Sequence, residues 1–438
     1  MASDFWIVLQ WWGSLFLVGA LAWPLTKALF GDGRATPKSS NPADEGWPAS
    51  NASRSDAGWW DGGYLFSKAV GMAVVTWVVY VLGTLRVMPF SVWSIGVALG
   101  VVFVLGIALQ VIRDKQKVIS KTKLFHFSLP LIEEIFFLAA LLFWSWIKGH
   151  EPSIRGLEKF MDFGFMQSIL NSRFFPPADM WYAGQPINYY YFGHMVTAVL
   201  TKLSGLDLAY TFNLMLATLF ALTLTMSFSI GMQLYRMNPM GQMRRMGDIA
   251  AGLLTAFLVT LAGNLQTIYA FTKGYTGENV RPFWELWWKI GDFGGIGGFW
   301  GKIGEGMNTY WYANATRFIP FTIHEFPGYS FVVSDVHGHV LSIPFVLLAI
   351  GLLMQMVICD KRHVISNTKD NSHFSLLFYG FLVGVLLMTN ALDGPIYLGL
   401  LVVVLGVQSA KCKVQSVKTV GIQLVIVIGA AILTSLPF

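Results

Sequence analysis

The chain has 438 residues, of which 55% are hydrophobic and only 12% are charged, and its formal net charge is +6. A soluble globular domain is usually about a quarter charged, so the composition excludes a water-soluble fold and requires lipid as part of the solvent. No segment carries the dense basic stripe of a nucleic-acid-binding surface, so nucleic acid is not expected as a partner.

Long apolar segments follow one another along the chain. A membrane-spanning helix needs about 20 mainly apolar residues, and the sequence predicts an all-α polytopic membrane protein with about ten spans. The predicted spans are roughly 5–30, 64–85, 92–112, 129–147, 208–235, 247–271, 340–358, 374–390, 395–409 and 419–436.

The segments between and around these spans suggest a division of the chain. Residues 31–63 are rich in Gly, Ser, Asn and Pro, which is typical of a flexible cytoplasmic linker. We expect residues 1–123 to form a three-helix membrane appendage and residues 124–438 to form the membrane core.

The segment 189–204 has an apolar face and a polar face at helical spacing, and the polar set is His194, Thr197 and Thr201. This pattern favours an amphipathic helix lying in the membrane interface over an eleventh span. If the helix lies flat, the four basic loops fall on one side of the membrane, as the positive-inside rule prefers. These loops are 113–123, 236–245, 361–369 and 411–418.

This topology predicts which segments face outward. The N-terminus, the long loops 148–207 and 273–339 and the turn around Asp393 then lie outside the cytoplasmic (plasma) membrane. The loops are rich in Trp, Tyr, Pro and Gly, and they hold most of the residues that could carry chemistry.

Two carboxylates in the first outer loop are four residues apart, so on a helix they share a face. Glu158 is expected to be a solvated carboxylate paired with Arg155 or Lys159. For Asp162 this interpretation and a functional one weigh equally, because a carboxylate set among aromatic side chains is costly unless it is used. No buried partner is predicted for Asp162, so its loss should leave folding unchanged.

The same loop continues into the run Tyr189, Tyr190 and Tyr191, which suits an aromatic belt at the membrane surface. His194 follows at the start of the predicted flat helix. A histidine hydrogen-bonded to a neighbour is favoured there over a metal ligand.

The second outer loop ends in alternating polar residues, Asp335, His337 and His339. In an extended segment they point the same way, and imidazole and carboxylate groups suit a divalent metal ion. The equal alternative is a hydrogen-bonded turn in which Asp335 caps the following helix.

Three further polar positions have structural alternatives. Arg317 stands in an apolar run and suits a phosphate group, although a snorkelling anchor also explains it. An Asp-Gly-Pro turn explains Asp393 fully. Glu133 and Glu134 are expected to cap the N-terminal end of the fourth span.

Several motifs resemble one known family. The run PINYYYFGHM, with EKFMDFGF, FFPPADMWYAG, HEFPGYSFVVSDVHGH and NALDGPIY in order over roughly 124–438, resembles the uncharacterised "YYY" membrane proteins, or DUF2298. That family is distantly similar to the GT-C membrane glycosyltransferases. The resemblance implies a catalytic acidic residue at Asp162, an aromatic juxtamembrane helix after it, and a lipid-linked sugar donor.

The resemblance also carries two departures. Phe163 follows Asp162 where some GT-C enzymes carry a second acidic residue. The chain ends at Phe438 directly after a span, where family members usually continue, so we expect it to be one piece of a longer protein or of a split protein that a partner chain completes.

The leading hypothesis is a GT-C-like glycosyltransferase that uses a polyprenyl-phosphate sugar donor on the outer membrane face. Asp162, together with Glu158, is the candidate base. Arg317, or a divalent metal ion held by Asp335, His337 and His339, would stabilise the departing phosphate. The other candidate substrate-binding residues are Tyr189, Tyr190, Tyr191, His194 and Asp393.

Two alternatives belong to other classes of protein. A transporter or flippase would place polar groups inside the spans, where the sequence shows chiefly Gln110, Asn264 and Gln266. A structural or assembly subunit fits the aromatic loops but not the carboxylates and histidines.

Overall fold

The computed structural model describes residues 2–31, 58–115, 128–237, 245–264, 301, 304, 315–316, 322–366, 372–412 and 417–438. Within these residues the regular elements are helices, with no strand, as the sequence predicts. The chain forms two compact units, one made of Met1–Ala256 and Val336–Phe438 and the other of Phe257–Asp335.

The long helices correspond to the predicted spans. They are α1 (Ala2–Phe30), α2 (Ser67–Thr84), α3 (Val92–Lys115), α4 (Ser128–Gly149), α7 (Leu208–Met237), α8 (Arg245–Thr260), α13 (Ile343–Ser366), α14 (Ser372–Thr389), α15 (Asp393–Cys412) and α16 (Val417–Ser435). The short helices are η4 (Tyr64–Phe66), α5 (Lys159–Asn171), α6 (Phe192–Ser204), α11 (Pro327–Val333) and α12 (Gly338–Leu341).

Eight helices in the described part of the chain are long and apolar enough to cross a membrane. The two other predicted spans correspond to α8 and α14, which contain shorter apolar helical segments. The α8 helix ends at Thr260, so the predicted span 247–271 is too long at its C-terminal end, and its last residues lie outside the described part.

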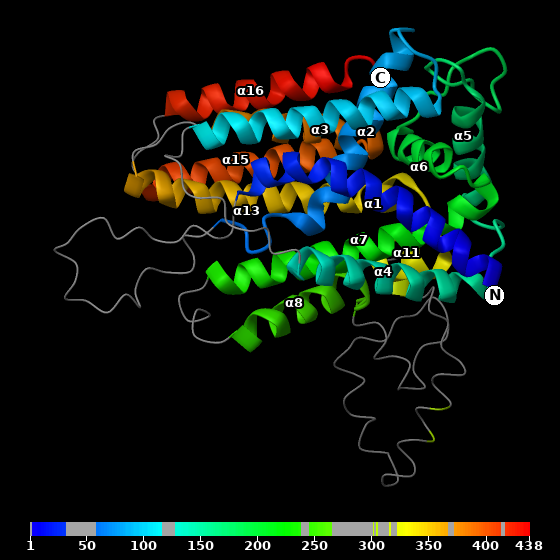
Figure 1. Cartoon of the computed structure of the whole chain (residues 1–438), viewed down its shortest axis with the longest axis horizontal. Helices are drawn as coiled ribbons and strands as arrows, with labels where there is room; N and C mark the ends of the chain where they lie inside the picture. Colours follow the sequence, from blue (N-terminus) through cyan, green and yellow to red (C-terminus); the bar gives the residue numbers. More distant parts are fainter. Residues whose placement is uncertain are drawn as a thin grey trace. The chain divides into compact units, whose positions relative to one another are not determined.

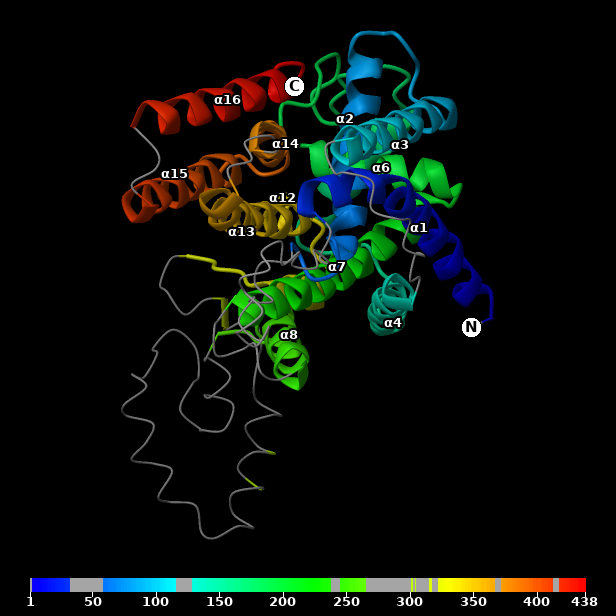
Figure 2. The same ribbon diagram turned by 60° about the vertical axis from the view of Figure 1, so that its left-hand side comes forward.

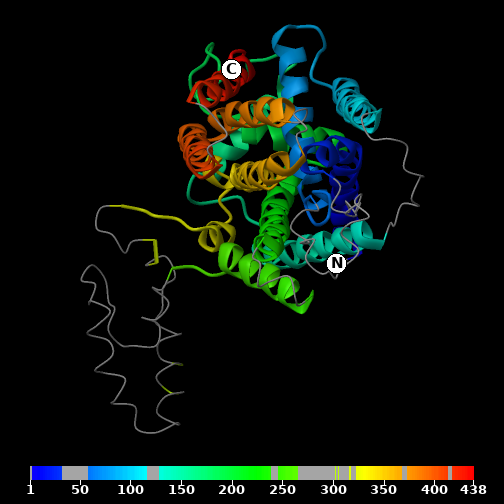
Figure 3. The same ribbon diagram turned by 90° about the vertical axis from the view of Figure 1, so that its left-hand side faces the viewer.

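The helices of the larger unit form two groups. Figures 2 and 3 show α13, α14, α15 and α16 on one side of α2, and α1 and α3 on the other. Small residues allow close packing of apolar helices, and the α14–α16 contact uses one. A Cβ atom at Gly380 would lie 2.5 Å from the carbonyl oxygen of Val427, so only glycine fits there.

The outer faces of this unit are apolar. Val104 on α3, Val403 on α15 and Val425 on α16 are 65%, 60% and 70% exposed. Their helices are candidate spans, so these side chains face lipid rather than water.

The two ends of the helices differ in character. The helix ends that flank the four basic loops lie together at the left of Figure 1, whereas α5, α6 and the first residues of α15 lie at the right. That the four basic loops share one side of the membrane stays a prediction. Which side faces the cytoplasm stays a prediction.

Part of the predicted linker belongs to the packed bundle. Trp59 is fully buried, and the indole N–H groups of Trp59 and Trp60 both donate to the Ser229 hydroxyl on α7, at 2.9 and 3.0 Å. The prediction of a flexible segment is therefore wrong for residues 58–63. Residues 32–57 lie outside the described part, and the division at residue 124 stays a prediction.

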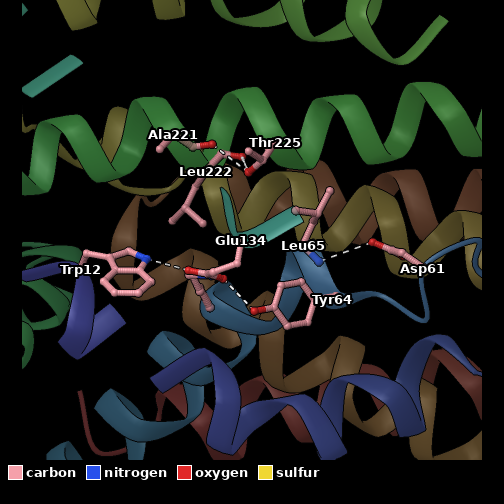
Figure 4. A network of polar contacts seen from close by, with 9 residues as sticks. Trp12, Asp61, Tyr64, Leu65, Glu134, Ala221, Leu222 and Thr225 are labelled. Atoms are coloured by element: carbon pink, nitrogen blue, oxygen red, sulfur yellow. Dashed lines mark hydrogen bonds and ion pairs between the residues drawn. The ribbon is translucent and has the colours of Figure 1, made fainter. Parts of the chain in front are cut away.

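The expected capping function of Glu133 and Glu134 is also wrong. Both side chains are buried, and Glu134 accepts hydrogen bonds from Trp12 and Tyr64, on α1 and η4 (Figure 4). The sequence pattern could not show that other helices supply donors at this position.

The smaller unit is held by local hydrogen bonds. Pro327 begins α11, and Ser334 ends it in the left-handed conformation, with the backbone N–H of Asp335 bonded to the Ser330 carbonyl at 3.1 Å. The Asn264 side chain donates to the Ala315 carbonyl at 2.6 Å. Asp335 therefore terminates a helix here, and the residue at the N-cap of α12 is His337.

Candidate functional site

The predicted flat helix is present as α6, and its setting differs from the prediction. Its thirteen residues are too few to cross a membrane. However, α6 is buried along nearly its whole length by helices that include α1, α2, α5, α7 and α14, so its polar face does not meet water. Thr201, for example, bonds the Thr197 carbonyl and the Thr211 hydroxyl, both at 2.7 Å.

The α5 helix covers one face of α6 and brings Asp162 to it. Asp162, Phe165 and Ile169 are buried at helical spacing, as expected for one face of an amphipathic helix. The α5 helix starts directly after Glu158, whose own side chain makes no capping hydrogen bond. Glu158 and Asp162 thus lie one turn apart, as the sequence predicts.

Asp162 and His194 form a buried pair. The His194 Nε2 atom lies 2.7 Å from Asp162 Oδ1, and neither side chain has any exposure. The second carboxylate oxygen, Oδ2, and His194 Nδ1 are also buried, and neither makes a hydrogen bond within the described residues. The expectation that Asp162 has no buried partner is therefore wrong.

His337 connects this pair to the surface. Its Nδ1 atom lies 3.1 Å from Glu158 Oε2 and 3.5 Å from Asp162 Oδ1. Its Nε2 atom lies 2.8 Å from the Tyr189 hydroxyl. These distances bring the imidazole ring of His337 against two carboxylates.

Tyr189 and Tyr190 complete the arrangement. Their rings stack with centroids 3.9 Å apart, and their hydroxyl groups are hydrogen-bonded at 2.8 Å. Tyr190 also packs directly on Gly338, where an added Cβ atom would lie 2.6 Å from the ring. A side chain larger than hydrogen at residue 338 would push Tyr190 away from His337.

The charges of this cluster follow from its contacts. Burial acts to raise the pKa of Asp162, but the hydrogen bonds and positive charge of His194 and His337 outweigh it, so that the pKa lies below the ordinary value. Burial and the Tyr190 hydrogen bond raise the pKa of Tyr189. Asp162 is therefore ionised and Tyr189 neutral at physiological pH.

The side chains of these residues differ in how far they are exposed to solvent. The Glu158 side chain is 63% exposed and the His337 side chain 14%, whereas Asp162 and His194 are fully enclosed. Glu158 and the edge of His337 are therefore the members of the cluster that solvent reaches. We name Glu158, Asp162, Tyr189, His194 and His337 the histidine–carboxylate cluster.

Tyr191, predicted to bind substrate, points into the core instead. It is only 2% exposed, and its ring packs against Phe438 with centroids 4.6 Å apart. The Tyr191 side chain differs in its setting from those of Tyr189 and Tyr190 because Tyr191 is the N-cap residue of α6, whereas the other two tyrosines precede the helix. The prediction for Tyr191 is therefore corrected.

Asp393, another predicted substrate-binding residue, is not a member of this cluster. Asp393 begins α15, with its backbone N–H bonded to the Asn390 carbonyl at 3.0 Å, as expected of a turn. Arg317 lies outside the described residues. Asp335 belongs to the smaller unit and His337 and His339 to the larger one, and metal binding by these three residues stays a prediction.

Two observations weigh against the metal ligands as predicted. His339 already lies in α12, so the segment is not extended throughout. Both ring nitrogens of His337 have protein partners, Glu158 and Tyr189, and a metal ion would have to displace one of them. A function of His337 in metal binding therefore stays a prediction.

The pairing of Asp162 with His194 was missed by sequence reasoning, which treated the two residues separately. The signal that could have found it is their shared character: each is an ionisable residue on an otherwise apolar helical face. When two such helical faces are buried, each ionisable group requires a hydrogen-bonding partner, and the other group can supply it.

Comparisons with known proteins give the chain a family. No curated protein and no solved structure matches it. A family model described as "Uncharacterized membrane protein (DUF2298)" matches residues 74–438, which include all members of the histidine–carboxylate cluster. The chain therefore belongs to the DUF2298 family of membrane proteins.

Proposed function

We propose that this membrane protein is a glycosyltransferase that moves a sugar from a polyprenyl-phosphate donor to an acceptor hydroxyl. The observation that carries the proposal is the contact of Glu158 and Asp162 with His337, a residue distant in the sequence, at one end of a membrane bundle. A carboxylate pair next to a histidine can supply a base, and the surrounding spans give access to a lipid tail.

The leaving group explains why one base is sufficient. A polyprenyl phosphate departs as a stable anion, so no general acid is needed, unlike the two-carboxylate arrangement of glycosidases. The acceptor oxygen bonds to the anomeric carbon while the bond from that carbon to the phosphate oxygen breaks. The proton of the acceptor hydroxyl passes to the base.

The exposures change which carboxylate takes that proton. A general base must come within hydrogen-bonding reach of the acceptor, and Asp162 is fully enclosed whereas Glu158 is 63% exposed. We assign the base to Glu158. Asp162 is a positioning residue, which holds His337 against Glu158, and Tyr189 fixes the other ring nitrogen.

The proposal also concerns the donor phosphate and the topology. Arg317 is a candidate for binding the donor phosphate, because its planar guanidinium group accommodates two phosphate oxygens. No step is assigned to a metal ion. The motif loops are proposed to face outward from the plasma membrane.

The test begins with the ligand. Native mass spectrometry of the protein purified in mild detergent should detect a bound polyprenyl phosphate or its sugar conjugate. Transfer from radiolabelled polyprenyl-phosphate sugars is then measured in lipid nanodiscs. Glu158→Gln should reduce turnover by ~10²–10⁴-fold, the usual contribution of a general base.

Glu151→Gln is the matched control, because Glu151 is an exposed carboxylate a short distance before α5 that does not join the cluster. It should retain wild-type turnover. Absence of any bound lipid phosphate, together with absence of transfer from every donor tested, would refute the proposal.

A transporter or flippase is the second candidate, because one observation favours it. Ionisable side chains lie buried within the spans, among them Lys68 and Glu134, which the sequence analysis did not count. Gln110, by contrast, serves packing, because it donates to the Pro24 carbonyl at 2.9 Å. Movement of a labelled lipid across proteoliposome membranes without sugar transfer would favour this candidate.

A further inference from the structure

Three basic side chains gather where the turn between α2 and α3 meets the far ends of α5 and α6. Arg86 lies in that turn, Arg173 follows α5, and Lys202 is in the last turn of α6. The segments are joined directly, because the backbone N–H of Phe90 donates to the Arg173 carbonyl at 2.8 Å. Three parts of the chain that are distant in sequence thus bring positive charges to one place.

Aromatic rings hold the three cations. The Cζ atoms of Arg173 and Arg86 lie 5.5 and 6.0 Å from the centroid of the Phe174 ring, so both guanidinium groups lie against one side chain. The Lys202 Nζ atom lies 4.1 Å from the centroid of the Phe90 ring. Cation–π contacts of this kind attract a cation but leave its charge in place.

Carboxylates do not neutralise these cations. The half-buried Lys202 ammonium group donates instead to the backbone carbonyls of Phe90 and Leu170, at 3.2 and 3.4 Å. Among the residues that the structure describes, neither arginine of this group nor Lys202 forms an ion pair with Asp or Glu. Like charges held close together repel one another, so an anion bound among them would be stabilised.

The backbone of Arg86 is in a conformation that favours glycine. Its φ angle is 55°, and its N–H donates to the Gly83 carbonyl at 3.2 Å. Only glycine adopts this left-handed conformation without steric cost. The turn between α2 and α3 therefore gains nothing from an arginine, and the side chain must be useful for its charge.

The surface beside the three cations is apolar. Leu85 and Val87, in the same turn as Arg86, are 67% and 65% exposed, and Trp93 at the start of α3 is 82% exposed. Both helices are candidate membrane spans. Exposed tryptophan at the end of a span is typical of the level at which lipid headgroups begin. An anion that reaches the cations here is one that a lipid carries.

We propose that Arg86, Arg173 and Lys202 bind the phosphate group of an anionic membrane phospholipid, with its acyl chains against the apolar surface of α2 and α3. A guanidinium group can bind two phosphate oxygens, and an ammonium group adds a point charge. The bound lipid would join the turn between α2 and α3 to α5 and α6.

This lipid site is separate from the histidine–carboxylate cluster. Asp162 lies in the first turn of α5, whereas Arg173 lies beyond its last residue, Asn171. The part of α5 between Asp162 and Asn171 is roughly 14 Å long, at about 1.5 Å per residue. The lipid is therefore not the proposed sugar donor, and the inference does not rest on sugar transfer.

The test is native mass spectrometry of the full-length protein in a mild non-ionic detergent, titrated with dioleoylphosphatidylglycerol or with dioleoylphosphatidylcholine. The wild type should retain the anionic lipid in preference to the zwitterionic one. The anionic lipid should also raise the thermal unfolding midpoint. Inorganic phosphate at millimolar concentration should neither raise the midpoint nor displace the lipid. If phosphate alone does both, the cations form a site for a free anion and the lipid proposal is overturned.

Variants assign the bound lipid to these residues. Arg173→Gln should weaken phosphatidylglycerol binding about tenfold or more, the effect of losing a hydrogen bond to a charged group. Arg86→Gly should weaken it similarly without lowering the unfolding midpoint in lipid-free detergent, because the backbone there favours glycine. Arg155→Gln is the matched control, since Arg155 is an exposed arginine between α4 and α5, and it should bind as the wild type does. Equal retention of both lipids by the wild type, or unchanged phosphatidylglycerol binding by both test variants, would overturn the proposal.

Discussion

The protein contains two buried groups of carboxylates that differ in their cationic partners. In the histidine–carboxylate cluster Asp162 is bound by His194 and His337, and one edge is open to solvent through Glu158. In the α2–α4 group Glu134 is bound by Lys68, and the members are enclosed. The first group uses imidazole rings as partners and the second a single ammonium group. One group is therefore accessible to a ligand, whereas the other can only join helices to one another.

The largest effect is expected from removing the buried ion pair between Lys68 and Glu134. Glu134→Ala strands Lys68 as a buried charge without a partner, and such changes typically cost about 3–5 kcal/mol. We expect a large fall in the thermal unfolding midpoint in detergent. A double variant, Lys68→Met with Glu134→Leu, should recover much of it. Equal stability of wild type and Glu134→Ala would show that the pair is not needed for cohesion.

Asp162→Asn should produce a smaller loss of stability together with a loss of activity. It replaces a charged acceptor of His194 with a neutral one, and hydrogen bonds to charged groups are worth about 1.5–3 kcal/mol. Because the pKa of Asp162 is depressed in the folded state, this contribution is present at neutral pH and disappears as the pH falls below the ordinary value of 3.8.

The activity readout separates a positioning function from a purely structural one. Asp162→Asn should change the pH–rate profile, because His337 loses a neighbouring negative charge, while KM for the donor changes little. A variant that is merely less stable would keep the wild-type pH profile at a temperature where it remains folded. That result would remove Asp162 from the mechanism.

Tyr189→Phe should have a milder effect. It removes the hydroxyl that bonds His337 Nε2 and Tyr190 but keeps the stacked ring. A single neutral hydrogen bond contributes about 0.5–1.5 kcal/mol, which corresponds to a roughly tenfold fall in turnover at most. A loss as large as that of Glu158→Gln would instead make Tyr189 a direct participant in proton transfer.

The last prediction concerns topology, namely which end of the helix bundle faces outward, and we expect its variants to leave stability unchanged. In a background with Cys359 and Cys412 replaced by Ser, Ser153→Cys marks the loop between α4 and α5, and Ser366→Cys marks the end of α13. A membrane-impermeant maleimide should label Ser153→Cys in intact cells and Ser366→Cys only after permeabilisation. The reverse pattern would place the histidine–carboxylate cluster inside the cell.

The sequence was sufficient for the spans but not for their partners. Apolar length depends only on local composition, so helices such as α3 and α7 appear where expected. The pairing of Asp162 with His194 depends on how α5 lies against α6, and no local pattern specifies that contact. Glu158 and Asp162 sharing a helical face was predictable because a four-residue spacing fixes it.

The errors have a common physical cause. Trp59, Glu133 and Tyr191 were assigned from their immediate neighbours, as linker, helix cap and surface aromatic. Each is in fact buried by elements far away in the sequence. The position of a polar or aromatic side chain inside a membrane bundle depends on whether a residue distant in the sequence offers it a hydrogen-bonding partner. Ser229 is such a partner for Trp59.

The Lys68–Glu134 pair has a consequence for biogenesis. Lys68 lies in the apolar segment Tyr64–Thr84, which a ribosome synthesises well before α4 and its glutamate. Lys68 lies about one turn inside this span, where a lone lysine disfavours insertion into lipid, although by less than the about 2.5–3.5 kcal/mol that it costs at the centre of a span. The second span should therefore remain beside the insertion machinery until the fourth arrives, so that the two helices enter the bilayer together.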